Sequence, residues 1–284
     1  MIDISKGRYW SRPWSLVDGC APCSPGCENC WSRAMATRFH KWPEKVTPRP
    51  DRLNIPLKTR KPTVFAIWND LFHEDVPDEF IVSAYMTIYS QTRHTFLILT
   101  KRPERMAEMT KRLYKNIFTN TPHAAEAENV WHGLTVCNQQ EADEKIPLLL
   151  QTPAAHRWIS IEPMLGEIDI HKYLLDSHYE GNHACRGVHA VILGGETGPH
   201  ARPMRPDWVR SVRDQCAAAG VPFFFKQWGE YLHESQLFDS GIGLDWFNDH
   251  VTPRGFAKVP RAKAGRLLDG RTHDELPWRK EATK

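Results

Sequence analysis

Long apolar runs are missing from this sequence, and their absence excludes a class of proteins. No segment approaches the roughly 18 consecutive apolar residues of a membrane-spanning helix. The first residues, MIDISKGRYWSRPW, also lack the apolar core of a secretory signal peptide. We therefore expect a cytoplasmic protein without membrane contact, in a reducing compartment where structural disulfides are disfavoured.

A strong charge imbalance, internal repeats and low-complexity linkers are absent as well. The formal net charge is +3 over 284 residues, which permits contact with nucleic acid but gives no argument for it. Hydrophobic residues make up 41% of the chain, enough to bury a core and to exclude disorder of the chain as a whole. The length suits one large domain or two small ones.

Cysteine is scarce but concentrated. The chain has seven cysteines, and four of them, Cys20, Cys23, Cys27 and Cys30, lie in the stretch DGCAPCSPGCENCW. Zinc sites usually join two C-x2-C pairs across a longer loop, whereas only three residues separate the pairs here. Dense runs of this kind are typical of iron–sulfur ligation. An iron–sulfur site is therefore favoured, with a zinc site and a redox dithiol as alternatives.

Short apolar runs alternate with helical patterns along most of the chain. The runs have the near-continuous, β-branched and aromatic character of strands buried on both faces, and they cover residues 14–17, 63–68, 95–100, 130–136, 157–161, 189–195 and 221–228. Helical patterns separate several of them, at residues 78–92, 103–115, 139–151 and 206–219. This alternation predicts an α/β fold, a full or partial TIM-like (β/α) barrel with parallel strands over residues 1–228. Residues 229–284 lose the rhythm, and we expect them to form an irregular C-terminal extension packed on the barrel.

Polar side chains gather just after the predicted strands, where barrel enzymes keep their active sites. In chain order these residues are Asn69, Asp70, Lys101, Arg102, Glu162, Glu196, Lys226 and Gln227, and the glycine pair Gly194 and Gly195 precedes Glu196. The other ends of the strands offer little comparable. This asymmetry predicts an enzyme, although loops are polar in most proteins.

Several stretches resemble those of a known family. They are GCAPCSPGCENCW, NDLFHEDVPDEF, HTFLILTKRPERM, EADEKIPLLLQTPAAHRWISIEPMLG, ILGGETGPHARPM, VPFFFKQWGE and AGRLLDGRTHDELP. The chain is similar, from about residue 10 to residue 278, to the three-Cys-motif proteins of phages and bacteria. That family in turn is similar to radical S-adenosylmethionine (SAM) enzymes such as spore photoproduct lyase. The resemblance implies a [4Fe–4S] cluster that cleaves SAM, an external electron donor, and a bacterial or phage-infected cell.

The resemblance also implies which cysteines hold the cluster, but two spacings compete. The family places six residues between the first and second cysteines, which selects Cys20, Cys27 and Cys30. Ordinary radical SAM spacing, C-x3-C-x2-C, selects Cys23 in place of Cys20. We favour Cys20, which leaves Cys23 as a free thiol. Asn29 stands where these motifs commonly carry an aromatic residue; Trp31 could supply the missing stacking surface, or belong to the core.

The resemblance and the strand-end positions together give each candidate a role. We expect cofactor contacts from Trp31, Asn69, Asp70, Gly194, Gly195 and Glu196, substrate contacts from Lys101, Arg102 and Gln227, and catalytic roles for Lys101, Glu162 and Lys226. Lys101 or Arg102 could instead bridge Asp70 or Glu162 without touching a ligand.

The resemblance suggests a nucleobase or nucleotide substrate. One version is an isomerase or lyase acting on an amino-acid-modified thymidine during phage DNA hypermodification. Two alternatives stay open: a radical SAM enzyme for a small molecule or peptide, and a metal-stabilised nucleic-acid-binding module.

Overall fold

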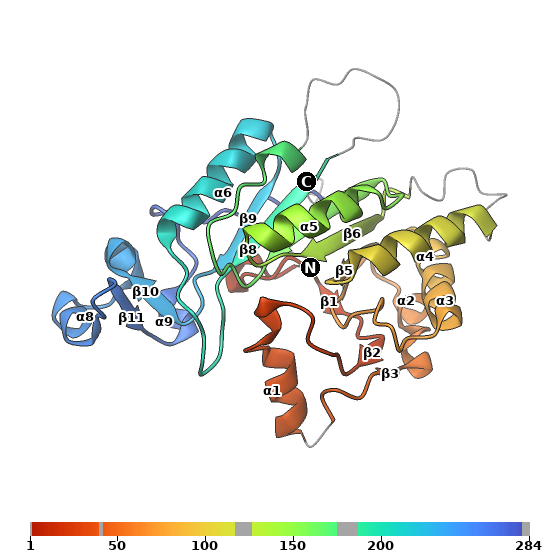
Figure 1. Ribbon diagram of the computed structural model, residues 1–284, viewed down its shortest axis with the longest axis horizontal. Coiled ribbons are helices and arrows are strands. Elements are labelled where there is room, and N and C mark those ends of the chain that lie inside the picture. Colours follow the sequence, from red (N-terminus) through yellow and green to blue (C-terminus); the bar gives the residue numbers. More distant parts are fainter. Residues whose placement is uncertain (1, 40–41, 117–126, 175–186, 280–284) are drawn as a thin grey trace.

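The computed structural model describes residues 2–39, 42–116, 127–174 and 187–279 (Figure 1). Its centre is one parallel sheet of seven strands in the order β1-β4-β5-β6-β7-β8-β9. The strands are β1 (Arg12–Pro13), β4 (Val64–Ile67), β5 (Thr95–Thr100), β6 (Val130–Thr135), β7 (His156–Ile161), β8 (Ala190–Gly194) and β9 (Phe223–Gln227). The order follows the chain, as repeated βα units require. The α/β class with parallel strands is therefore confirmed.

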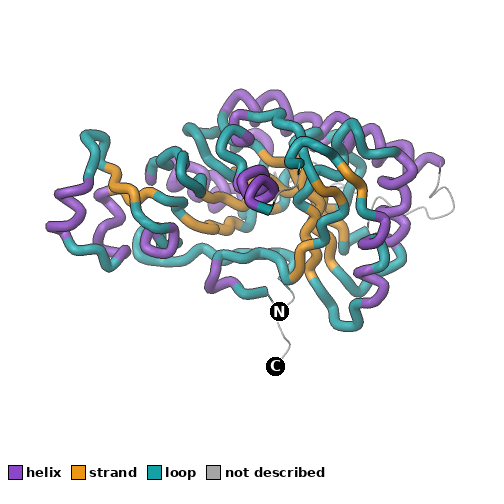
Figure 2. Tube along the Cα trace, turned by 90° about the horizontal axis from the view of Figure 1, so that it is seen from below, coloured by secondary structure: helices purple, strands orange, loops and turns teal. Residues whose placement is uncertain are grey.

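The sheet does not close on itself. In the described part of the chain, β1 and β9 form its two edges and do not pair with each other. The arrangement is thus an open half-barrel, and the full barrel among the predicted alternatives is not formed. Figure 2 shows the strands side by side, with helices along one flank.

Four helices cover the outer face of the sheet. They are α3 (Asp78–Tyr89), α4 (Pro103–Asn116), α5 (Gln139–Leu150) and α6 (Pro206–Ala219), and they follow β4, β5, β6 and β8. Alternate strand residues, such as Phe65, Ile98 and Ile159, pack with these helices in the larger hydrophobic core. Full burial of such side chains contributes about 1.5–3 kcal/mol each. None of the helices in the described ranges is long and apolar enough to span a bilayer.

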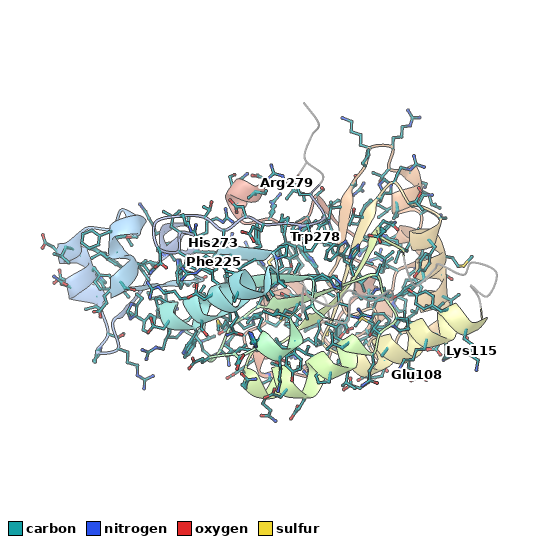
Figure 3. All side chains as sticks on the ribbon, turned by 90° about the horizontal axis from the view of Figure 1, so that it is seen from above. Glu108, Lys115, Phe225, His273, Trp278 and Arg279 are labelled. Atoms are coloured by element: carbon teal, nitrogen blue, oxygen red, sulfur yellow. The ribbon has the colours of Figure 1, made fainter. Side chains whose placement is uncertain are left out.

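The inner face of the sheet carries an aromatic cluster that ties the two ends of the chain together. Trp131, Trp158 and Phe224 point to this face and meet Tyr9 and Trp278. The Trp278 Nε1 donates a hydrogen bond of 2.8 Å to the Tyr9 carbonyl. The return of the C-terminal segment to the sheet can be followed at Trp278 in Figure 3. This side of the half-barrel is therefore filled, away from the strand ends that hold the candidate site.

The segment after residue 228 first leaves the sheet and then comes back. It forms an antiparallel pair of strands with short helices: β10 (Tyr231–His233), η6 (Glu234–Gln236), α7 (Leu237–Ser240), α8 (Leu244–His250), β11 (Phe256–Lys258) and α9 (Arg261–Ala264). The chain then returns beside β9, where the Phe225 N–H donates to the His273 carbonyl at 3.0 Å. Figure 3 labels both residues. The irregular extension thus covers the β9 edge of the sheet. The predicted division of the chain into a barrel (residues 1–228) and an extension (residues 229–284) stays a prediction.

The first strand differs from the expectation. Residues 14–17 were predicted to form it, but β1 is Arg12–Pro13, and pairing with β4 ends where the Trp14 N–H donates to the Ala66 carbonyl at 2.8 Å. The apolar run is buried even so, with Trp14 fully enclosed. Its last residue joins a separate antiparallel pair, β2 (Val17–Asp18) with β3 (Thr47–Pro48).

The excursion between β1 and β4 contains the four clustered cysteines. Its remaining elements are η2 (Pro25–Cys27), α1 (Trp31–Arg38), η3 (Pro50–Arg52) and α2 (Ile55–Lys58); two further 3-10 turns elsewhere are η1 (Ile4–Lys6) and η5 (His171–Tyr173). The chain turns away from the sheet after Trp14 and places residues 19–30 over the carboxyl ends of the strands, as the contacts below show.

Candidate functional site

Residues 19–30, called the cysteine loop below, contain all four clustered thiols. Cys20, Cys27 and Cys30 line one small cavity of about 50 Å³, together with the start of α1. Cys23 is exposed and does not line this cavity. The cavity therefore groups the trio that the family spacing selects. No three His, Cys, Asp or Glu side chains in the described part of the chain are close enough to form a ready-made metal site. The metal site thus stays a prediction, and cysteine thiols are the donor type that iron–sulfur clusters use.

A hydrogen bond between two of the thiols and the charge of a nearby lysine shift the pKa values of the cysteines. A hydrogen bond from the Cys23 side chain lowers the pKa of Cys27 to about 5, against the effect of burial, and the charge of Lys101 lowers it further. The same hydrogen bond raises the pKa of Cys23. Burial raises the pKa of Cys20. Because the thiolate is the form that binds metal, the loop holds one ligand group ready as an anion.

Lys101 lies at the end of β5 and supplies this positive charge. Burial acts to lower the pKa of its ammonium group, but the charges of Cys27, Cys137 and Cys30 outweigh it, so the pKa is raised. Lys101 therefore stays protonated beside the thiols. The structure thus places Lys101 near the cysteines. Its two predicted roles, contact with a substrate and catalysis, stay predictions.

A buried ion pair anchors the start of the cysteine loop. The Arg102 guanidinium contacts the Asp70 carboxylate at 2.8 Å, and Asp70 also accepts from the Thr100 hydroxyl at 2.6 Å. Arg102 reaches Glu74 at 2.9 Å and donates to the Ala21 carbonyl at 3.3 Å. The guanidinium and the Asp70 carboxylate are thus engaged with protein groups. The bridge to Asp70, predicted as the alternative to ligand binding, is the arrangement that the structure has.

A second ion pair, with one buried partner, anchors the other end of the loop. Glu196, only 5% exposed, receives two hydrogen bonds of 2.7 and 2.8 Å from the Arg202 side chain and one from the Arg202 N–H. Arg202 also binds Glu28 at 2.9 Å and the Pro25 carbonyl at 3.0 Å, and Asn29 donates to Glu196 at 3.3 Å. Glu196, predicted to contact the cofactor, therefore holds the loop that carries the cysteines.

Close packing fixes the middle of the loop. A Cβ atom at Gly26 would overlap the Cys137 sulfur and come within 3.0 Å of the Pro163 ring, so only glycine fits without a shift. The Ser24 hydroxyl lies 3.7 Å from the Cys137 sulfur and accepts from the Gly26 N–H at 3.2 Å. The loop is thus held against the ends of β6 and β7 as well as β5 and β8.

The other two predicted catalytic residues form an ion pair. The Lys226 ammonium lies 2.7 Å from the Glu162 carboxylate, which also accepts from the Ser160 hydroxyl at 3.0 Å and the Tyr9 hydroxyl at 3.4 Å. Lys226 also lies 5.7 Å from the centre of the Tyr9 ring. These polar groups face the inner side of the sheet, above the aromatic cluster. The catalytic role of Glu162 and Lys226 stays a prediction.

The glycine pair at the end of β8 packs against β9. The Gly195 N–H donates to the Gln227 carbonyl, and the Gln227 side chain donates to the Gly195 carbonyl, both at 2.9 Å. A Cβ atom at Gly195 would overlap the Trp228 carbonyl, and one at Gly194 would lie 3.0 Å from Glu162. The polar groups of Gly195 and Gln227 are therefore used within the sheet. The Gly195 N–H and the Gln227 side-chain N–H already donate to carbonyl groups of the sheet. The predicted contacts of Gly195 with the cofactor and of Gln227 with the substrate stay predictions.

The remaining cofactor candidates lie near the loop. Asn69 is half-buried two residues after the end of β4, next to the Asp70 anchor. Trp31 opens α1 and is 54% exposed, so the core alternative for it is wrong.

Sequence reasoning missed three groups that shape this site. Arg202 anchors the loop, His73 accepts from the Ala21 N–H at 3.3 Å, and Cys137 packs under Gly26. Each of them lies in a strand-end stretch, Arg202 in GGETGPHARPM, His73 in NDLFHED and Cys137 in CNQQ, but no sequence pattern indicated their contacts with the loop.

Comparison with known proteins identifies a family and leaves the chemistry open. No curated protein and no solved structure matches the chain at a significant level. A family model described as "Protein of unknown function (DUF5131)" matches residues 5–277, nearly the whole chain. The chain therefore belongs to the DUF5131 family.

Proposed function

We propose that the protein is a radical SAM enzyme of the cytoplasm, in which Cys20, Cys27 and Cys30 hold a [4Fe–4S] cluster. The observation that carries the proposal is that these three thiols line one cavity between the cysteine loop and α1, and that the cation of Lys101 acts on Cys27 and Cys30. The Asp70–Arg102 and Glu196–Arg202 ion pairs and a glycine contact fix the loop that carries them. When bound, the cluster and SAM would supply one-electron cleavage of SAM and abstraction of a substrate hydrogen atom.

The chain's own residues would hold the cluster, orient SAM and the substrate, and shield them from water. Lys101 offsets the negative charge of the thiolates in a poorly solvated place, where an unpaired charge is costly. The Asp70–Arg102 and Glu196–Arg202 pairs hold the ligand loop in register with the sheet. Glu162 and Lys226, an ion pair on the inner face, are the proposed catalytic residues there. The open parallel sheet is compatible with a partial (β/α) barrel.

The placement of Cys23 supports the choice of ligands. It is exposed and outside the cavity that the other three thiols line. A ligand set with Cys23 in place of Cys20 would need this exposed thiol to turn inward. We therefore assign Cys23 as a hydrogen-bond partner of Cys27 and not as a ligand.

The proposed substrate is a nucleobase or nucleotide, in one version an amino-acid-modified thymidine, with rearrangement or lysis as the reaction. This part rests on the resemblance to three-Cys-motif proteins. SAM, the nucleotide and an external electron donor are the partners that the reaction requires.

Anaerobic reconstitution with iron and sulfide, followed by an assay for 5′-deoxyadenosine with SAM and dithionite, tests the proposal. We expect SAM-dependent formation of 5′-deoxyadenosine by the native protein and none by Cys27→Ala. Stoichiometric zinc without iron, and no SAM cleavage, would instead indicate the metal-stabilised binding module.

A further inference from the structure

Three tryptophans form a connected row beside the cysteine loop. Trp68 follows β4, Trp10 precedes β1, and Trp31 comes directly after Cys30. The ring centres of Trp10 and Trp68 lie 4.5 Å apart with an interplanar angle of 81°, and those of Trp31 and Trp68 lie 6.1 Å apart with an angle of 86°. The Trp68 ring is thus nearly perpendicular to both the Trp10 ring and the Trp31 ring.

The row lies on the inner side of the sheet. Phe65 and Ile67 of β4 belong to the helix-covered core, while Val64 packs against the inner cluster, so alternation directs Trp68 inward. Trp10 packs against the same inner cluster. The row therefore leads from the filled part of the half-barrel to the cysteine loop, where a substrate of the proposed reaction has to lie.

Two features of the row point to a ligand. Trp68 carries a buried indole N–H that has no hydrogen-bond partner within the described residues. Buried indole N–H groups usually find an acceptor. Trp31 is 54% exposed although it is large and aromatic. A planar molecule with an acceptor at its edge would cover the Trp31 face and satisfy the Trp68 N–H.

A cation stands at the far end of the row. The Arg8 guanidinium lies 5.5 Å from the centre of the Trp10 ring, and Arg8 is exposed. Guanidinium groups bind phosphate with charge-assisted hydrogen bonds. A stacking face, an in-plane donor and a cation together match the three parts of a nucleotide: the flat base, the acceptor atoms on its edge, and the phosphate.

We propose that Trp10, Trp68 and Trp31 form a nucleobase-binding site for a nucleotide substrate. Trp31 stacks on the base, the Trp68 N–H donates to an acceptor on the base edge, and Arg8 contacts the phosphate. The binding site stands by itself, whereas its role as the substrate site rests on the proposed function. The adenine of SAM offers the same chemistry, so the experiment has to separate the two.

Binding constants of the intact, anaerobically reconstituted protein test this assignment, with thymidine 5′-monophosphate and SAM as separate probes in equilibrium dialysis. Trp31→Ala should weaken nucleotide binding about 5- to 150-fold, the usual effect of losing one base–aromatic stack. Trp68→Phe keeps a ring but removes the N–H, and should weaken it about 2- to 10-fold. Trp42→Ala is the control, because Trp42 is 81% exposed and outside the row; its effect should stay within about twofold.

Three results would overturn the inference. The first is no nucleotide binding by the native protein at millimolar concentration. The second is equal binding by Trp31→Ala, Trp68→Phe and Trp42→Ala. The third is a loss of SAM affinity alone in Trp31→Ala and Trp68→Phe, which would show that the three tryptophans bind the cofactor and not the nucleotide. Iron content and 5′-deoxyadenosine formation are measured on the same samples. A protein that binds nucleotide through the row but holds no iron would sink the proposed function and leave the site standing.

Discussion

The ion pair between Arg202 and Glu196 gives the sharpest test of how the cysteine loop is held. Arg202→Met keeps much of the length of the side chain and removes the guanidinium. The substitution leaves the Glu196 carboxylate, 5% exposed, without its cation, and it deletes the contacts with Glu28 and the Pro25 carbonyl. We expect the loop to detach from the end of β8 more often, because its remaining bond there to Glu196 comes from Asn29.

The structure sets the size of this effect. Breaking a buried ion pair costs about 3–5 kcal/mol, and breaking an exposed one costs about 0–1 kcal/mol. The Arg202 side chain is 32% exposed and that of Glu196 is 5% exposed, so the pair falls between these classes. We expect a cost of about 2–3 kcal/mol, which corresponds to a roughly 30- to 150-fold rise in the detached population of the loop.

Iron release into a chelator measures the detachment in the reconstituted protein, and urea unfolding measures the stability of the metal-free protein. Arg210→Met is the matched control: the Arg210 side chain is 30% exposed, but its partners Asp207 and Asp269 are more exposed than Glu196 and lie away from the loop. It should cost at most about 1 kcal/mol and leave iron release unchanged. Adding Glu196→Gln to Arg202→Met should recover part of the loss, since no unpaired buried charge remains. Equal iron release from Arg202→Met and Arg210→Met would refute the reasoning.

Three further predictions follow from the same contacts. Gly26→Ala should prevent cluster binding without changing the far-ultraviolet circular dichroism, because its Cβ would overlap the Cys137 sulfur; Gly26→Ala with Cys137→Ala should recover binding, and failure to do so would argue against this contact. Lys101→Met should shift the pH midpoint of Cys27 alkylation in the metal-free protein upward from about 5, because the Lys101 charge helps to lower that pKa; an unchanged midpoint contradicts the placement of Lys101. Burial acts to raise the pKa of Glu196, but hydrogen bonds from Arg202 and Asn29 lower it below the ordinary 4.5, so its contribution to stability is present above that pH and is lost as the pH falls through the lower native value. Urea unfolding should therefore show a loss of stability in acid that Glu196→Gln reduces, and identical pH profiles would exclude it.

Much of the fold could be predicted because its strands are buried on both faces and carry continuous apolar runs. Residues 95–100 form β5 as expected, and the predicted helix at 78–92 is α3, Asp78–Tyr89. The first run, residues 14–17, failed as a strand because apolar character reports burial and not pairing: Trp14 is enclosed, yet the chain has already turned away from β4. Closure of a barrel depends on contacts between β1 and β9, and no local pattern encodes these.

The candidate site was predictable in its location but not in its internal connections. The rule that strand ends carry the site placed Asp70, Lys101 and Glu196 around the cysteine loop. Which of them would be used by the protein itself could not be foreseen, since the partners are remote in sequence: the contact of Arg202 with Glu28 spans 174 residues, and that of Ser24 with Cys137 spans 113. The sequence therefore predicts a cofactor contact for Glu196, whereas in the structure Glu196 binds Arg202 and holds the cysteine loop.

The central claim is that Cys20, Cys27 and Cys30 hold an iron–sulfur cluster. Iron and sulfide analysis with electron paramagnetic resonance, on anaerobically reconstituted Cys20→Ala and Cys23→Ala beside the native protein, tests it most directly. We predict about four irons and four sulfides per chain in the native protein and in Cys23→Ala. Cys20→Ala should lose the cluster, because its thiol lines the cavity that Cys23 does not reach. Loss of the cluster in Cys23→Ala but not in Cys20→Ala would contradict the ligand assignment, and a native protein that binds zinc and no iron would contradict the claim itself.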